Sequence, residues 1–147
     1  MTISRRQARE WAVQMLSAAD LNPPEDVDAF VEAFWRQLPS LENEEGGIDG
    51  RAAKGRMKDF SEGLVRGVLK DMSAIDAELV ALLDHWDLYR LGVVERSVLR
   101  MGIYEIKLGE TPSGIVVNEA VDLVNWFSQP SSRTLVNGVL DRFAKKA

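Results

Sequence analysis

Few residues of this 147-residue chain are suited to acid–base, nucleophilic or metal chemistry. The chain has no cysteine and one histidine, His85, which excludes disulfides, thiolate metal sites and histidine clusters. It contains no glycine-rich phosphate loop followed by Lys-Ser/Thr and no G-x-S-x-G elbow. We interpret His85, beside Asp84 and Asp87, as a partly exposed histidine at a helix end. These absences disfavour enzymatic, metal or cofactor chemistry.

Three arginines near the N-terminus are the most informative polar residues. In "RRQAREW", a helix at about 100° per residue brings Arg5, Arg6 and Arg9 into one arc beside an apolar stripe. Guanidinium groups form forked hydrogen bonds with phosphates and stack on unpaired bases, which is how single-stranded RNA is commonly held. The alternative is a solvated face on which Arg6 pairs with Glu10.

A second anion site is suggested by "PSSRT", at the start of the last predicted helix. Free backbone N–H groups, the hydroxyl of Ser131 or Ser132 and the guanidinium of Arg133 could together bind a phosphate there. The alternative is a serine N-cap beside a solvent-facing arginine. The sequence leaves both interpretations open.

Acidic charge is concentrated in one segment. The net charge is −5, but residues 20–50 contain nine acidic residues and one arginine, a local charge of −8 that leaves +3 elsewhere. Glu42, Glu44 and Glu45 lie in "PSLENEEGGIDG", which has no hydrophobic period and is predicted to be a surface loop. The mildly basic remainder permits an anionic partner, and the acidic segment would suit a basic one.

Helical periodicity dominates the chain, and no segment requires a strand. The predicted helices follow Ser4, follow "NPPED", span about 51–72, follow Ser73, and then include "VVERSVLRMGIYEIKL", "VVNEAVDLVNWF" and "LVNGVLDRF". The fifth is apolar on most of its circumference and is the expected core helix. We therefore predict one all-α domain of about seven helices in two small packed bundles, about 1–72 and 73–147.

Asn137-Gly138 is a strong hairpin signal, but Val136, Val139 and Leu140 keep helical spacing. The pair is therefore predicted inside the last helix. A glycine there costs about 1 kcal/mol relative to alanine, which predicts a close approach by another helix. Asn137 is either exposed toward RNA or a partner, or buried and hydrogen-bonded, and we favour the buried position.

No targeting or membrane segment is evident. "MTISRRQAREW" has no apolar region after its arginines, and no apolar run approaches the roughly 20 residues that cross a bilayer. We expect a cytoplasmic protein with no membrane partner.

Four stretches, "RRQAREWAVQML", "VVERSVLRMGIYEI", "PSGIVVNEAVDLVNWF" and "SSRTLVNGVLD", together resemble the NusB family of bacterial transcription antitermination factors. Residues 20–72 match that family only as amphipathic helices. The resemblance implies an all-helical fold of two bundles without enzymatic activity. It also implies pairing with NusE, a small-subunit ribosomal protein, and binding of the heterodimer to boxA RNA of ribosomal RNA leaders. This assembly would act within an RNA polymerase antitermination complex.

The resemblance also implies roles for particular residues. Seven are expected at or near the RNA: Arg5, Arg6, Arg9, Ser131, Ser132, Arg133 and Asn137. Two at the expected exposed start of the central helix are candidates for the partner or RNA surface: Glu95 and Arg96.

Two positions depart from the family pattern. Ser17 stands where many relatives have tyrosine, and Leu135 where phenylalanine is common, so two aromatic contacts are missing. Stacking contributes about 1–3 kcal/mol per base, so we expect low RNA affinity for the chain alone and dependence on its partner.

Two other functions are considered. The first is a NusB paralogue that binds protein and has lost RNA binding. The second, a NusB-like domain of an rRNA cytosine methyltransferase, is disfavoured because no cofactor-binding domain follows "FAKKA". The sequence leaves open whether the chain forms a homodimer.

Overall fold

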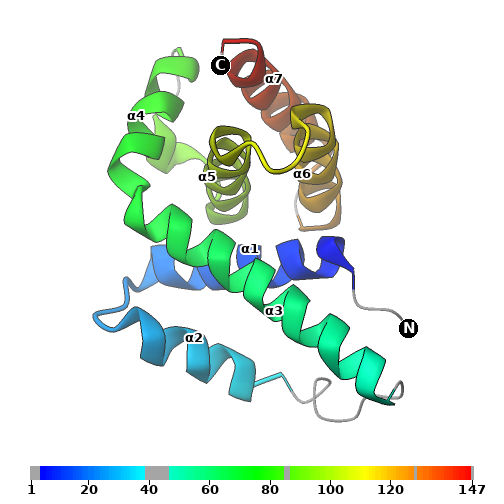
Figure 1. The fold of residues 1–147 in the computed structure, drawn as a ribbon. Helices are drawn as coiled ribbons and strands as arrows, with labels where there is room; N and C mark the ends of the chain where they lie inside the picture. The colour runs from blue at the N-terminus through cyan, green and yellow to red at the C-terminus, as the bar shows by residue number, and fades with distance from the viewer. Residues whose placement is uncertain (1–3, 39–46, 85–86, 128, 147) are drawn as a thin grey trace. The chain divides into compact units, whose positions relative to one another are not determined.

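The computed structural model describes residues 4–38, 47–84, 87–127 and 129–146, with the backbone alone for 47–53 and for residue 127. Within these ranges the chain forms seven α-helices, one 3-10 helix and no strand (Figure 1). In chain order these are α1 (Arg5–Leu21), α2 (Val27–Arg36), α3 (Gly47–Lys70), α4 (Met72–Leu82), η2 (Leu88–Arg90), α5 (Val93–Leu108), α6 (Ser113–Phe127) and α7 (Pro130–Lys146). The predicted all-α fold is confirmed.

The chain divides into two compact units, Met1–Arg66 and Gly67–Ala147. The division falls inside α3, whose last turn therefore belongs to the second unit. Gly67 shows why, because a Cβ at this position would overlap the ring of Tyr104 in α5. The sequence predicts the division between the two bundles at about residue 72, which corresponds to the junction between α3 and α4.

Side-chain caps fix the start of the first two helices. The Ser4 Oγ accepts a hydrogen bond from the backbone N–H of Gln7 at 3.4 Å, so Ser4 caps α1 as predicted. The Asp26 carboxylate accepts one from the N–H of Ala29 at 3.1 Å and caps α2. In both cases a short polar side chain satisfies an N–H group that has no partner within the helix.

Two predicted caps are wrong. Ser73 lies inside the first turn of α4, because Asp71 alone separates α3 from α4 and takes the N-cap position. Ser132 lies inside the first turn of α7, because that helix already begins at Pro130. Proline suits this first position, since its ring presets the helical φ and no N–H is needed there.

The core of the first unit comes mainly from α1 and α3, and of the apolar face predicted for α2 only Val31 is fully buried. The buried apolar side chains of this unit are Ala8, Trp11, Ala12, Val13, Met15, Leu16, Ala19, Val31, Leu64 and Val65. Trp11 and Trp35 meet edge to face with their ring centroids 5.3 Å apart, which joins α1 to α2. The indole N–H of Trp35 donates to Glu62 at 2.6 Å and joins α2 to α3. These contacts position the first two turns of α1.

In the second unit α5 is the central helix and contacts α4, α6 and α7 (Figure 1). It is buried on most of its circumference, as its sequence predicts. Gly102 allows α7 to approach, because a Cβ there would lie only 2.6 Å from Leu140 Cδ1. Gly109, with φ of 73°, ends α5 in the left-handed conformation.

Asn137 and Gly138 lie inside α7, which confirms the helical interpretation of the pair. The other two expectations for them are wrong. A Cβ on Gly138 would meet no atom within 4 Å, so no helix approaches it closely. Instead Gly138 lines an open hollow of about 310 Å³ beside Leu82 and Leu83. Asn137 is exposed because it points away from the apolar face of α7.

Candidate nucleic-acid interface

The first two turns of α1 carry the predicted arginine cluster. Arg5 and Arg9 lie one turn apart, and their Cζ atoms are 5.1 and 5.2 Å from the centroid of the Phe60 ring in α3. Both guanidinium groups therefore converge on one aromatic ring. Such a cation–π contact is worth about 0.5–1 kcal/mol at an exposed site, enough to restrict a long side chain.

The three arginines of this cluster differ in exposure. Arg5 and Arg6 are exposed, whereas Arg9 is only 3% exposed. The solvent-accessible cations on this part of α1 are thus Arg5 and Arg6, and Arg9 packs beneath them against Phe60. Arg5 presents an exposed guanidinium that the aromatic ring holds in place, which suits contact with a phosphate or a base.

The start of α7 forms the second predicted site, in the second unit. Ser131 and Arg133 are exposed there. The Ser132 hydroxyl donates to the Glu95 carboxylate at 2.7 Å, so it ties α7 to the first turn of α5. A carboxylate beside the helix N-terminus disfavours an anion there, so the anion site at this position stays a prediction.

Asn137 lies one helical turn beyond Arg133 and is exposed as well. Residues four apart on a helix lie on one face, so the two side chains extend the same surface of α7. Leu135 lies between these two residues in the sequence and is half-buried. It stands where phenylalanine is common in the family.

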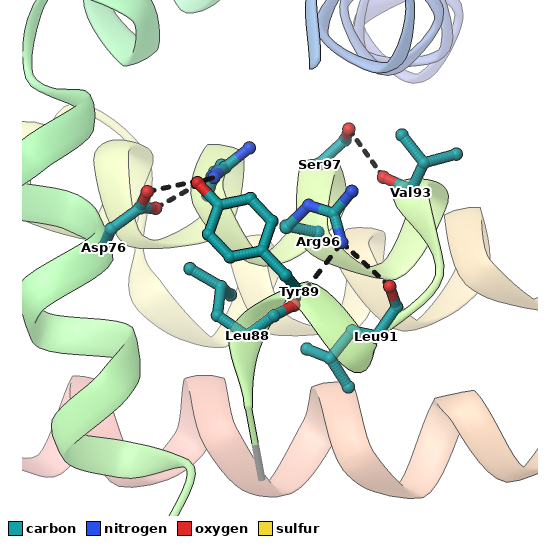
Figure 2. Close-up of polar contacts among 8 residues, drawn as sticks. Asp76, Leu88, Tyr89, Leu91, Val93, Arg96 and Ser97 are labelled. Atoms are coloured by element: carbon teal, nitrogen blue, oxygen red, sulfur yellow. Dashed lines mark hydrogen bonds and ion pairs between the residues drawn. The ribbon is translucent and has the colours of Figure 1, made fainter. Parts of the chain in front are cut away.

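Arg96 is not at the exposed start of α5, contrary to expectation. It is 7% exposed, and one of its terminal nitrogens donates to the backbone carbonyls of Leu88 at 3.4 Å and Leu91 at 2.8 Å (Figure 2). The Leu88 carbonyl also accepts the backbone N–H of Leu91 at 3.3 Å, so Arg96 adds a second donor there and bonds the Leu91 carbonyl as well. Glu95, half-buried and bonded to Ser132, is the more accessible of the two candidate partner residues.

A second buried arginine of α5 was not predicted from the sequence. Arg100 of α5 donates from Nε and Nη2 to the two carboxylate oxygens of Asp76 in α4, at 2.8 and 2.9 Å. Its Nη2 also donates to the hydroxyl of Tyr89 at 3.4 Å. The sequence contained a signal for this pair, because Arg100 stands among apolar residues of the expected core helix. A charged side chain buried at such a position nearly always has a partner of opposite charge.

Some predicted features fall outside this description. His85, Glu42, Glu44 and Glu45 lie outside the described residues. In the part of the chain that the structure describes, no group of three or more His, Asp or Glu side chains is placed to hold a metal ion. Within the same ranges, no helix is both long enough and apolar enough to cross a membrane.

Comparison with known proteins decides the family. The family model described as "NusB family" matches residues 6–145. The chain belongs to the NusB family. One relative, the transcription antitermination protein NusB of Anaeromyxobacter dehalogenans, is 35% identical over 144 residues, which cover 98% of this chain and 92% of the relative. The resemblance noted in the sequence is therefore confirmed.

Solved NusB structures share the fold. The structure of T. maritima NusB matches with a TM-score of 0.79 and 26% identity, covering 99% of this chain and 94% of that one. A structure described as antitermination factors NusB and NusE in complex with double-stranded RNA matches with a TM-score of 0.75 and 26% identity, covering 97% of each chain.

Proposed function

We propose that this chain is a transcription antitermination factor that binds boxA RNA of ribosomal RNA leaders together with NusE. In this proposal it promotes read-through by RNA polymerase in the cytoplasm. The observation that carries the proposal is the similarity, over 97% of each chain, to a NusB solved with NusE and RNA. The exposed arginines of α1 supply the chemistry that such an RNA contact needs.

The RNA-facing residues of this proposal separate into direct and positioning groups. The direct group shares exposure to solvent and consists of Arg5, Arg6, Ser131, Arg133 and Asn137. Arg9 and Ser132 position other residues. Arg9 packs against the Phe60 ring that also contacts Arg5, and the Ser132 hydroxyl donates a hydrogen bond to Glu95. Glu95 is proposed as a partner contact, and Arg96 as a residue that shapes the backbone beside it.

The charge of the chain supports dependence on a partner. A protein of net charge −5 with few clustered cations can neutralise only a few phosphates, and phosphate contacts provide most of the affinity for RNA. A basic partner would bring further cations, and the acidic residues of this chain would favour its association. We therefore expect weak RNA binding by the chain alone and tighter binding with NusE.

The proposal is tested by measuring boxA RNA affinity across a range of salt concentrations for wild type and Arg5→Ala, with NusE present. Loss of one phosphate contact weakens binding and reduces the slope of log K against log salt by about 0.7–0.9. Lys107→Ala is the matched control, since Lys107 is an exposed cation at the far end of α5 from Glu95. Equal effects of the two variants would overturn the assignment of Arg5.

The protein-binding alternative makes a different prediction. A paralogue that has lost RNA binding would still associate with NusE, but the pair would bind boxA RNA no better than NusE alone. That result would replace the proposed function with a protein-interaction module.

A further inference from the structure

Tyr89 is a large aromatic side chain that the fold leaves exposed. It lies in η2, immediately before α5, and is 67% exposed, whereas its neighbours Leu88 and Leu91 are buried. The core is therefore anchored by the two leucines, and the tyrosine ring contributes little to it. The exposed ring is therefore accessible to a ligand.

Two arginines hold the exposed ring in place. The Cζ atoms of Arg96 and Arg100 lie 5.0 and 5.9 Å from the centroid of the Tyr89 ring, and Arg100 also donates to its hydroxyl. Both arginines are themselves fixed. Arg96 is held by backbone carbonyls on either side of Tyr89 (Figure 2). Arg100 is held by the Asp76 carboxylate. The ring is thus exposed but preorganised, so a ligand that stacks on it loses little side-chain entropy.

Hydrogen bonds connect η2, the first turn of α5 and the first turn of α7. Arg96 holds η2 against the first turn of α5, and the preceding residue, Glu95, accepts a hydrogen bond from Ser132 of α7. Arg133 follows Ser132, and Arg90 follows Tyr89, both exposed. An aromatic face therefore lies within a short chain of contacts from exposed guanidinium groups. Single-stranded nucleic acids are bound by this combination of cations for phosphates and rings for bases.

We propose that Tyr89 is a stacking platform for an unpaired nucleobase of the RNA, a role that rests on the RNA-binding function proposed above. The surroundings favour a base over a protein side chain. Within the described stretch 87–92, the other exposed residues are Asp87, Arg90 and Gly92, which are polar or small. Protein hot spots need a desolvated apolar patch, whereas a flat base needs only the face of one ring.

The test compares Tyr89→Phe and Tyr89→Leu in binding to single-stranded boxA RNA with NusE present, and to a short oligoadenylate. Tyr89→Phe keeps the ring and is expected to bind within about two-fold of wild type. Tyr89→Leu keeps apolar bulk without a π face and is expected to bind about 5- to 150-fold more weakly, the fold-change that corresponds to losing one base–aromatic stack. The salt slope should stay unchanged, because stacking neutralises no phosphate.

Controls separate stacking from misfolding and from the wider function. Val80→Ala removes another exposed apolar side chain, and thermal unfolding of every variant reports the fold. Unchanged RNA affinity in Tyr89→Leu overturns the platform and leaves the proposed function intact. Weaker NusE binding with unchanged RNA binding would assign Tyr89 to the protein partner and also overturns it. If the wild-type protein does not bind boxA RNA but binds oligoadenylate, and Tyr89→Leu weakens that binding, the proposed function is refuted and the stacking role of Tyr89 is retained.

Discussion

Removal of the Asp76 carboxylate should destabilise the second unit through the buried arginine that it pairs. Asp76→Ala deletes both acceptors of the two-pronged contact and leaves the Arg100 guanidinium, whose side chain is 3% exposed, without its counter-ion. A buried charge that loses its partner cannot recover its hydration, so the cost exceeds that of a lost surface pair.

The magnitude follows from the geometry. Breaking a buried ion pair costs about 3–5 kcal/mol. The Asp76 side chain is 20% exposed, so water can reach the vacated space and the cost should fall at the lower end, about 3 kcal/mol. For a chain of this size that corresponds to a decrease in Tm of roughly 6–12 °C.

Denaturant unfolding followed by circular dichroism measures the effect in wild type, Asp76→Ala, Arg100→Met and the double variant. The double variant should recover at least half of the unfolding free energy that Asp76→Ala loses, because it leaves neither member of the pair buried without the other. Lys145→Ala is the control, since its pair with Asp141 is exposed on both sides and should contribute less than about 0.5 kcal/mol. An Asp76→Ala cost no larger than that of Lys145→Ala would refute the reasoning.

Three further substitutions test packing. The hydroxyl of Ser61 is buried without a hydrogen-bond partner, so Ser61→Ala should raise the free energy of unfolding by about 1 kcal/mol, and a loss of stability in denaturant unfolding would contradict this. Gly138→Ala should stabilise α7 by up to about 1 kcal/mol, since the new Cβ meets nothing. Gly102→Ala should destabilise by about 1–2 kcal/mol, because its Cβ meets Leu140, and equal effects at the two glycines would be inconsistent with this packing.

The helices could be predicted from the sequence because each must bury one apolar face. That requirement makes apolar residues recur with the spacing of an α-helix, and this spacing is visible along the chain. The same period placed Asn137 and Gly138 inside α7 against a strong turn signal. Helix starts were predictable only where a side-chain cap decides them, as at Ser4. At α4 the one-residue junction with α3 decides the start, which residue type did not reveal, whereas α7 begins at Pro130, a residue suited to the first helical position.

The candidate site was less predictable because it depends on contacts between distant residues. Burial of Arg9 requires the ring of Phe60, and the position of Arg96 depends on carbonyls of a three-residue turn. The pair of Arg100 with Asp76 joins two helices that no spacing rule relates. Helical periodicity places a side chain on a face of its own helix, but only the tertiary structure shows what covers that face.

The central claim is that this member of the NusB family binds boxA RNA jointly with NusE. The most direct measurement is the equilibrium dissociation constant of the purified chain for boxA RNA and for a scrambled RNA of equal length, each with and without NusE at one fixed salt concentration. We predict weak binding by the chain alone, and tight, boxA-selective binding with NusE that exceeds the binding of NusE by itself. Equal affinity for boxA and scrambled RNA, or no gain from adding this chain to NusE, would contradict the claim.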